Sequence, residues 1–104
     1  MNTNYTYIKH KACYFCKIIT PIVQDLVDEG WDIETVDHNS EKGHKHNAPT
    51  PSIHTGEVLI TPEVLMSALL MYDMYPHKFQ FENKKEVMKF VLQSNKTLPI
   101  EFQE

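Results

Sequence analysis

The only two cysteines of the chain, Cys13 and Cys16, lie three positions apart. Two thiols at this spacing can close a small, reversible disulfide, or they can bind a metal with ligands from elsewhere in the chain. In a reducing compartment, a close pair is more often catalytic or metal-binding than a structural cross-link. The pair is therefore the first candidate for chemistry, and its surroundings must distinguish redox chemistry from metal binding.

The residues on either side of the pair predict a strand that leads into a helix. Upstream, residues 4–9 contain the aromatic and β-branched run Tyr5-Thr6-Tyr7-Ile8. Downstream, apolar residues recur at helical spacing, namely Ile19, Ile22, Val23, Leu26 and Val27. The helix is expected to run from about Tyr14 to Glu29. We expect one helix kinked at Pro21 and stopped by Gly30, because the apolar stripe stays in phase across the proline.

This placement gives the two sulfurs different surroundings. Cys13 lies at the expected helix start, where free N–H groups and the macrodipole stabilise a thiolate. Cys16 lies one turn further on and is expected to be shielded. His10 is expected to be a solvated loop residue, and when protonated it would further stabilise the Cys13 thiolate.

A metal site is the main alternative for the cysteines, because the chain has six histidines. His44 and His46 could join the pair in a zinc site with two cysteines and two histidines. Their spacing is poor, since zinc-finger histidines lie three to five residues apart on a helix. We therefore expect no metal and no other cofactor. Two buried, unlinked thiols are the remaining alternative.

The rest of the chain predicts a small α/β sheet. Residues 31–37 alternate as a strand, which completes a βαβ unit with parallel strands and a right-handed crossover. Residues 38–50 predict a polar loop with room for one helical turn. A hairpin split by Gly56 follows, and then a helix over residues 62–72 with Thr61 as N-cap. The expected product is a four-stranded mixed sheet of order 2-1-3-4 flanked by helices.

We expect a single domain over residues 1–104, with its core at about residues 4–73 and a C-terminal helical extension over about residues 74–104. In the extension, Phe79 and Phe81 alternate as a short strand would, and Asn83 is placed to cap a helix over residues 84–94. The apolar tail 98–102 is expected to dock on the core or on a partner.

Composition excludes several classes of function. The formal net charge is −4 and the chain has no arginine, which argues against nucleic acid as a partner. No apolar run is long enough to span a bilayer, so no membrane role is expected. The first residues lack a basic segment followed by an apolar one, so we expect a cytoplasmic protein, acting as a monomer.

Several motifs together resemble the thioredoxin and glutaredoxin family. Tyr7-Ile8-Lys9, three residues before Cys-x-x-Cys-Lys, is similar to the active-site loop of glutaredoxins, and Pro21, five positions after Cys16, is similar to the active-site helix of thioredoxins. Residues 36–39 resemble the end of the following strand. Thr50-Pro51-Ser52 resembles the loop with the family's cis-proline, with Pro49 as the other candidate. The likeness covers about residues 5–73 and implies a thioredoxin-like fold.

The chain also departs from the family. Tyr14-Phe15 is neither the Gly-Pro of typical thioredoxins nor the Pro-Tyr of typical glutaredoxins. The buried acid of thioredoxins would fall near Tyr7, and the first acidic residue is Asp25. Residues 56–59 lack the Gly-Gly and acidic pair that hold glutathione in glutaredoxins, so glutathione binding is not expected.

The resemblance implies a thiol–disulfide oxidoreductase. Cys13 would attack a disulfide of a protein substrate and Cys16 would resolve the mixed disulfide, while Tyr14, Phe15, Thr50 and Pro51 would bind the substrate. A reductase or a small thiol would return the electrons, and ribonucleotide reductase is one candidate acceptor. The competing hypothesis is a non-enzymatic protein-interaction module of the same fold, with idle or zinc-bound cysteines.

Overall fold

The computed structural model describes residues 4–46, 48–56 and 58–95 and contains one mixed sheet. Its strands are β1 (Tyr5–Lys9), β2 (Ile33–Asp37), β3 (Ser52–Thr55) and β4 (Val58–Ile60), in the order β2-β1-β3-β4. β1 pairs with β2 in parallel, and the pairs β1–β3 and β3–β4 are antiparallel. The strand order predicted from the sequence is therefore confirmed.

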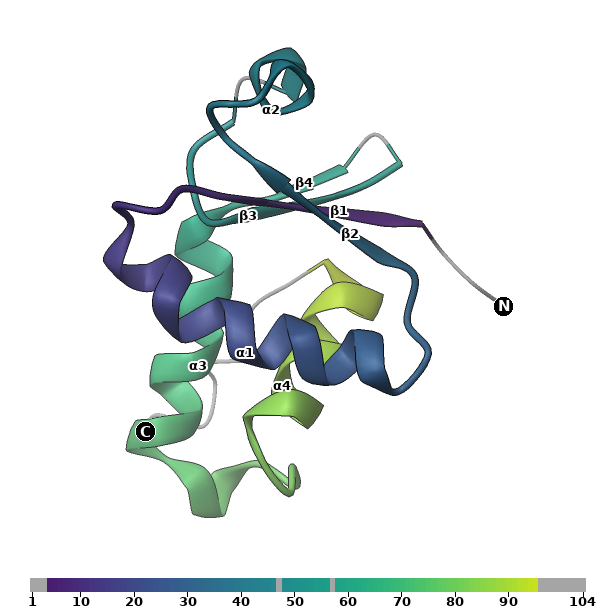
Figure 1. Cartoon of the computed structure of the whole chain (residues 1–104). Helices are drawn as coiled ribbons and strands as arrows, with labels where there is room; N and C mark the ends of the chain where they lie inside the picture. Colours follow the sequence, from purple (N-terminus) through teal and green to yellow (C-terminus); the bar gives the residue numbers. More distant parts are fainter. Residues whose placement is uncertain (1–3, 47, 57, 96–104) are drawn as a thin grey trace.

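Helices lie on both faces of this sheet. α1 (Tyr14–Asp28), α3 (Pro62–Met74) and α4 (Lys84–Ser94) gather on one face, while the short α2 (Glu41–His46) lies on the other (Figure 1). A single 3₁₀ turn, η1 (Pro76–Lys78), leads from α3 toward α4. Within the described part of the chain, no helix has both the length and the apolar content needed to cross a bilayer.

Local signals in the sequence explain where the helices begin and end. α1 runs through Pro21 without a break and ends at Asp28, two residues before Gly30, whose φ of +104° lies in the left-handed region. The Thr61 side chain accepts the Val64 N–H at the start of α3, and Asn83 accepts the Glu86 N–H in the same way at α4. These bounds agree closely with the expected ones.

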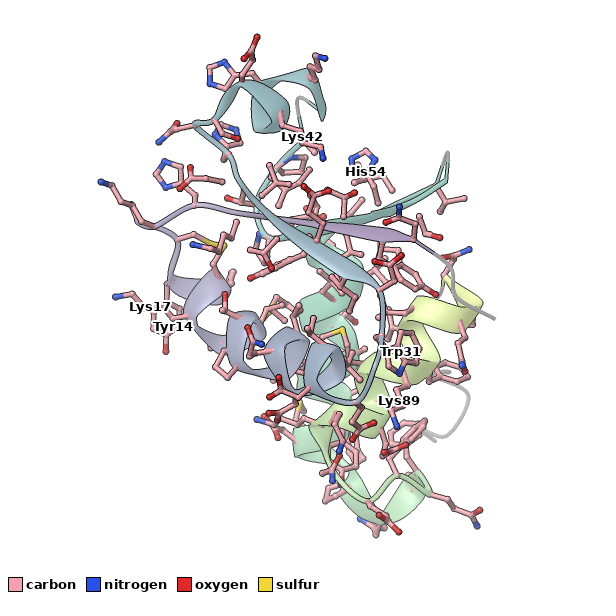
Figure 2. All side chains as sticks on the ribbon, turned by 45° about the vertical axis from the view of Figure 1, so that its right-hand side comes forward. Tyr14, Lys17, Trp31, Lys42, His54 and Lys89 are labelled. Atoms are coloured by element: carbon pink, nitrogen blue, oxygen red, sulfur yellow. A yellow bond between two sulfur atoms is a disulfide. The ribbon has the colours of Figure 1, made fainter. Side chains whose placement is uncertain are left out.

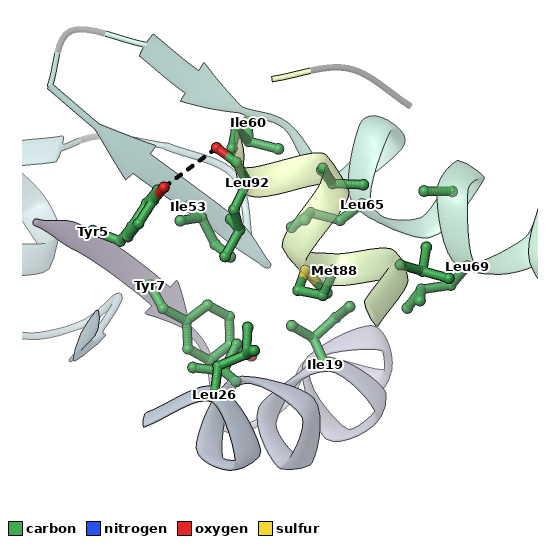
Figure 3. Close-up of a cluster of buried hydrophobic side chains, with 14 of the residues drawn as sticks. Tyr5, Tyr7, Ile19, Leu26, Ile53, Ile60, Leu65, Leu69, Met88 and Leu92 are labelled. Atoms are coloured by element: carbon green, nitrogen blue, oxygen red, sulfur yellow. Dashed lines mark hydrogen bonds between the residues drawn. The ribbon is translucent and has the colours of Figure 1, made fainter. Parts of the chain in front are cut away.

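The hydrophobic core lies between the sheet and the three helices of one face. Figure 3 shows side chains from β1, α1, the β3–β4 hairpin, α3 and α4 meeting there. The hydroxyl of Tyr5 also donates to the carbonyl oxygen of Leu92 at 3.4 Å, which connects β1 directly to α4. The largest fully buried side chains are Tyr7, Ile8, Ile19, Leu26, Ile53, Ile60, Leu65, Met88, Leu92, Val23 and Val87.

α4 belongs to this core and is not a peripheral addition. Its buried residues are Val87, Met88, Val91 and Leu92, and they join the cluster formed by the sheet, α1 and α3.

The expected short strand at Phe79 and Phe81 was wrong, because these residues form no strand. Phe79 is instead buried in the core, and the Phe81 ring packs against Phe90 with centroids 5.8 Å apart. The predicted tail 98–102 lies outside the described residues.

The opposite face of the sheet carries a smaller apolar contact with α2. Ile8 and Val36 are paired in register and buried, and the alternation of side chains along β1 puts Ile8 on the face opposite to Tyr7. Ala48, just after α2, is also buried. Gly43 in α2 lies so close to the end of β2 that an added Cβ would fall 2.8 Å from the carbonyl oxygen of His38. The absence of a side chain at Gly43 therefore lets α2 approach β2.

Candidate functional site

Cys13 and Cys16 are joined by a disulfide at the start of α1, with their Cα atoms 5.2 Å apart. Cys13 is the N-cap residue, and its Sγ accepts the backbone N–H of Cys16 at 3.1 Å. A tight turn brings the chain from β1 to this position, because the N–H of Cys13 donates to the carbonyl of His10 at 3.0 Å. The hydrogen bond to sulfur shows that the helix start provides a donor for this atom.

The two cysteines differ in exposure, as the sequence predicted. Cys16 is only 3% exposed, whereas Cys13 is half-buried. Tyr14 and Phe15, which lie between them, are 71% and 46% exposed, with ring centroids 5.7 Å apart. Tyr14 projects from the first turn of α1 into solvent (Figure 2). The surface beside Cys13 is therefore apolar and accessible.

The loop before β3 reaches the same edge of the sheet. The Thr50–Pro51 peptide bond is cis, which agrees with the expectation for Pro51 over Pro49. Ser52 pairs with Ile8 in the antiparallel register, so Thr50 and Pro51 lie at the end of β1 that leads to Cys13. Pro51 is buried and Thr50 is half-buried. Their contact with a substrate stays a prediction.

A pocket of about 300 Å³ opens next to Cys16. It is formed by the end of β1, the turn that follows, and the first turns of α1. Its lining residues are Lys9, His10, Lys11, Cys16, Lys17, Thr20 and Pro21. No motif in the sequence predicted this pocket. The sequence did contain one feature that points to it: three lysines occur before the first acidic residue, Asp25.

A buried tyrosine lies beneath this pocket. Tyr7 is fully buried, and its hydroxyl lies 2.8 Å from Oγ1 of Thr20 and donates to the carbonyl of Cys16 at 3.4 Å. Burial raises the pKa of Tyr7, and the hydrogen bond with Thr20 lowers it by a smaller amount. Near neutral pH the hydroxyl therefore keeps its proton and acts as a neutral hydrogen-bonding group.

Three histidines line up near the turn before Cys13. The ring centroids of His10 and His38 are 5.7 Å apart, and those of His38 and His44 are 6.1 Å apart. Nδ1 of His10 accepts the N–H of Ala12 at 3.0 Å. Among residues 4–46, 48–56 and 58–95, no group of three or more His, Cys, Asp or Glu side chains is arranged to hold a metal ion. The side chain of His46, part of the zinc hypothesis, lies outside the described part of the structure.

No protein-family model, curated protein or solved structure matches this chain. The comparisons therefore assign no family.

Proposed function

We propose that this protein is a thiol–disulfide oxidoreductase with a thioredoxin-like fold, which reduces disulfides of protein substrates through Cys13 and Cys16. One observation carries the proposal. The disulfide closes the first turn of α1, with the half-buried Cys13 as N-cap and the buried Cys16 behind it. A disulfide placed in this way leaves one sulfur open to attack and protects the other.

In the reduced protein, the Cys13 thiolate begins the reaction. The N–H of Cys16, which donates to Sγ of Cys13 in the disulfide form, is positioned to stabilise negative charge on that sulfur. The thiolate attacks one sulfur of a substrate disulfide, the substrate S–S bond breaks, and the other substrate sulfur leaves as a thiolate. Cys13 is then held in a mixed disulfide with the substrate.

Cys16 completes the transfer. It loses its proton to solvent, and its sulfur attacks Sγ of Cys13, which releases the second substrate thiolate and forms the Cys13–Cys16 disulfide. Two electrons have then passed to the substrate, and its two thiolates take protons from solvent. A dithiol or reductase must return two electrons to the protein before the next turnover.

Reduction of insulin disulfides, with dithiothreitol as the recycling dithiol, tests this function. The wild-type protein should accelerate insulin precipitation over dithiothreitol alone, and protein alkylated at its thiols should not. Cys16→Ser should accumulate a mixed disulfide with a substrate protein, whereas Cys13→Ser should trap little, and both should lose dithiol turnover.

The order of alkylation supplies a second measurement on the reduced protein. Iodoacetamide should label Cys13 before Cys16, because Cys16 is almost completely covered. Faster labelling of Cys16, or full turnover by Cys13→Ser, would contradict the assigned roles. A folded protein with no activity on insulin would instead favour the interaction module.

A further inference from the structure

The charged side chains that line the pocket next to Cys16 are all basic. Three of its seven lining residues are lysines, one is a histidine, and none is an aspartate or glutamate. Its volume of about 300 Å³ lies at the lower end of the range for small-molecule sites, so it could take a group of amino-acid size. Lys17 extends from α1 into solvent on the same turn as the cysteines (Figure 2).

The pocket lysines differ from several other lysines of the described residues, because no carboxylate pairs with them. Lys9, Lys11 and Lys17 form no ion pair in the described part of the chain. Lys9 is in register with Asp37, whose carboxylate accepts the N–H of Asn39 at 2.8 Å and forms no ion pair with Lys9. Other lysines have carboxylate partners: Lys42 pairs with Glu34, Lys84 with Asp73, and Lys85 and Lys89 with Glu29. The pocket is thus a local positive site in a chain of net charge −4.

This positive site lies within reach of the reacting sulfurs. Lys11 precedes Cys13 by two residues, and Lys17 directly follows Cys16. The Cα atoms of Cys13 and Cys16 are only 5.2 Å apart, and Cys16 lines the pocket. When a substrate is bound to Cys13 through its own sulfur, a substrate group a few bonds from that sulfur could therefore reach the pocket. Lysine ammonium groups and the Thr20 hydroxyl are hydrogen-bond donors suited to an anion.

We propose that this pocket binds a carboxylate carried close to the disulfide of the substrate, so that Lys9, Lys11 and Lys17 select anionic disulfides. The proposal rests on the oxidoreductase function and specifies its substrate class. The carboxylate could belong to a small amino-acid-like disulfide or to an acidic residue beside a disulfide in a peptide. Attraction by clustered, unpaired charges raises the rate of encounter with an anion and weakens as salt screens it.

The test compares small disulfides that differ in charge. We would measure kcat/KM for dithiodipropionate, hydroxyethyl disulfide and cystamine, which are anionic, neutral and cationic, each normalised to its uncatalysed reaction with dithiothreitol. We expect the anionic disulfide to be favoured over the cationic one by on the order of tenfold at low salt. Replacing Lys9, Lys11 and Lys17 together by glutamine should remove this preference, measured as the ratio of kcat/KM for the anionic disulfide to kcat/KM for the cationic one, in which any change in the Cys13 thiolate cancels.

A charge-matched variant provides the control. Replacing Lys42, Lys45 and Lys84 by glutamine changes the net charge equally, and these lysines do not line the pocket. This variant should keep the preference. Loss of the preference in both variants, or no preference in the wild type, would overturn the proposal.

Paired peptide disulfides with Glu or Gln next to the cysteine distinguish the two sources of the carboxylate. A preference for Glu that depends on the pocket lysines supports a peptide source, and a preference limited to dithiodipropionate supports a small-molecule source.

Failure to reduce even the neutral disulfide would contradict the oxidoreductase function itself. In that case, titration of the oxidised protein with succinate, followed by amide NMR shifts, still tests the pocket. Shifts around residues 9–21 that vanish in the pocket variant would support carboxylate binding, and their absence would overturn it.

Discussion

The hydroxyl of Tyr7 lies 2.8 Å from Oγ1 of Thr20, and this contact joins the central strand β1 to α1 about one turn after Cys16. Tyr7 has no exposed surface, whereas Thr20 lines the lysine-rich pocket next to Cys16. The same hydroxyl donates to the carbonyl of Cys16 at 3.4 Å. Tyr7 therefore supports the turn of α1 that holds the buried sulfur.

Removing this hydroxyl should weaken the fold. Tyr7→Phe keeps the ring in the core but leaves Thr20 and the Cys16 carbonyl without this partner, so we expect a loss of about 1 kcal/mol in the free energy of unfolding. Urea denaturation measures the loss. The control is Tyr14→Phe, which removes the same atom from an exposed ring and should have little effect. Equal stability of Tyr7→Phe and wild type would show that the contact contributes nothing.

The raised pKa of Tyr7 predicts a loss of stability in alkali. In the unfolded chain tyrosine ionises near pH 10, whereas the folded protein keeps Tyr7 protonated to higher pH. The contribution of Tyr7 is therefore complete below pH 10 and is lost as the pH rises through the folded value. The pKa values of Lys85 and Lys89 are also raised, by hydrogen bonds to Glu29, so they add to the same decline. The midpoint of urea denaturation should fall less steeply above pH 10 in Tyr7→Phe than in wild type, and parallel curves would contradict the assignment.

The exposed aromatic pair beside Cys13 should matter for protein substrates and not for small dithiols. Replacing Tyr14 and Phe15 by serine should raise KM for insulin severalfold, because apolar contact area is lost, and should leave the reaction with dithiothreitol unchanged. Leu70→Ser is the matched control, since Leu70 is 57% exposed on α3. An equal rise in KM in the control would indicate a nonspecific effect of surface polarity.

Gly43 should tolerate no side chain. In Gly43→Ala the new Cβ would meet the carbonyl oxygens of Asp37 and His38, so α2 or the end of β2 must move. We expect a destabilisation of about 1–3 kcal/mol, typical of overpacking, despite the better helix propensity of alanine. Lys45→Ala in the same helix is exposed and should be nearly neutral. Thermal unfolding of both variants, side by side, decides whether this close approach is needed.

Met88 tests whether α4 is part of the cooperative core. It is 1% exposed, so Met88→Ala should cost about 2–5 kcal/mol through lost burial and a residual cavity. Gln93→Ala on the exposed side of α4 should cost little. Fluorescence of Trp31 and far-ultraviolet circular dichroism should report one coincident transition. Separate transitions, with α4 lost first, would mean that this helix is an independent extension.

The local structure of this protein follows from its sequence. Apolar residues at helical spacing predict α1 across Pro21, and the side chains of Thr61 and Asn83 predict the starts of α3 and α4. The strand order also follows, because a βαβ crossover followed by a hairpin permits few arrangements. The cysteine spacing and the expected helix start further predict that Cys16 is covered and Cys13 is accessible.

Other features are decided only by the tertiary structure. Lys9, Lys11 and Lys17 come together around a pocket because β1, its following turn and α1 meet there. No local pattern in the sequence predicts that these lysines have no ion pair with other described residues. The partners of Tyr7 depend on how α1 packs on β1. Alternation at Phe79 and Phe81 resembles a strand, but tertiary packing uses both rings to cover the α3 and α4 side of the core. Local periodicity reports which face of an element is apolar, whereas the neighbour that covers this face is selected by the packing of the whole chain.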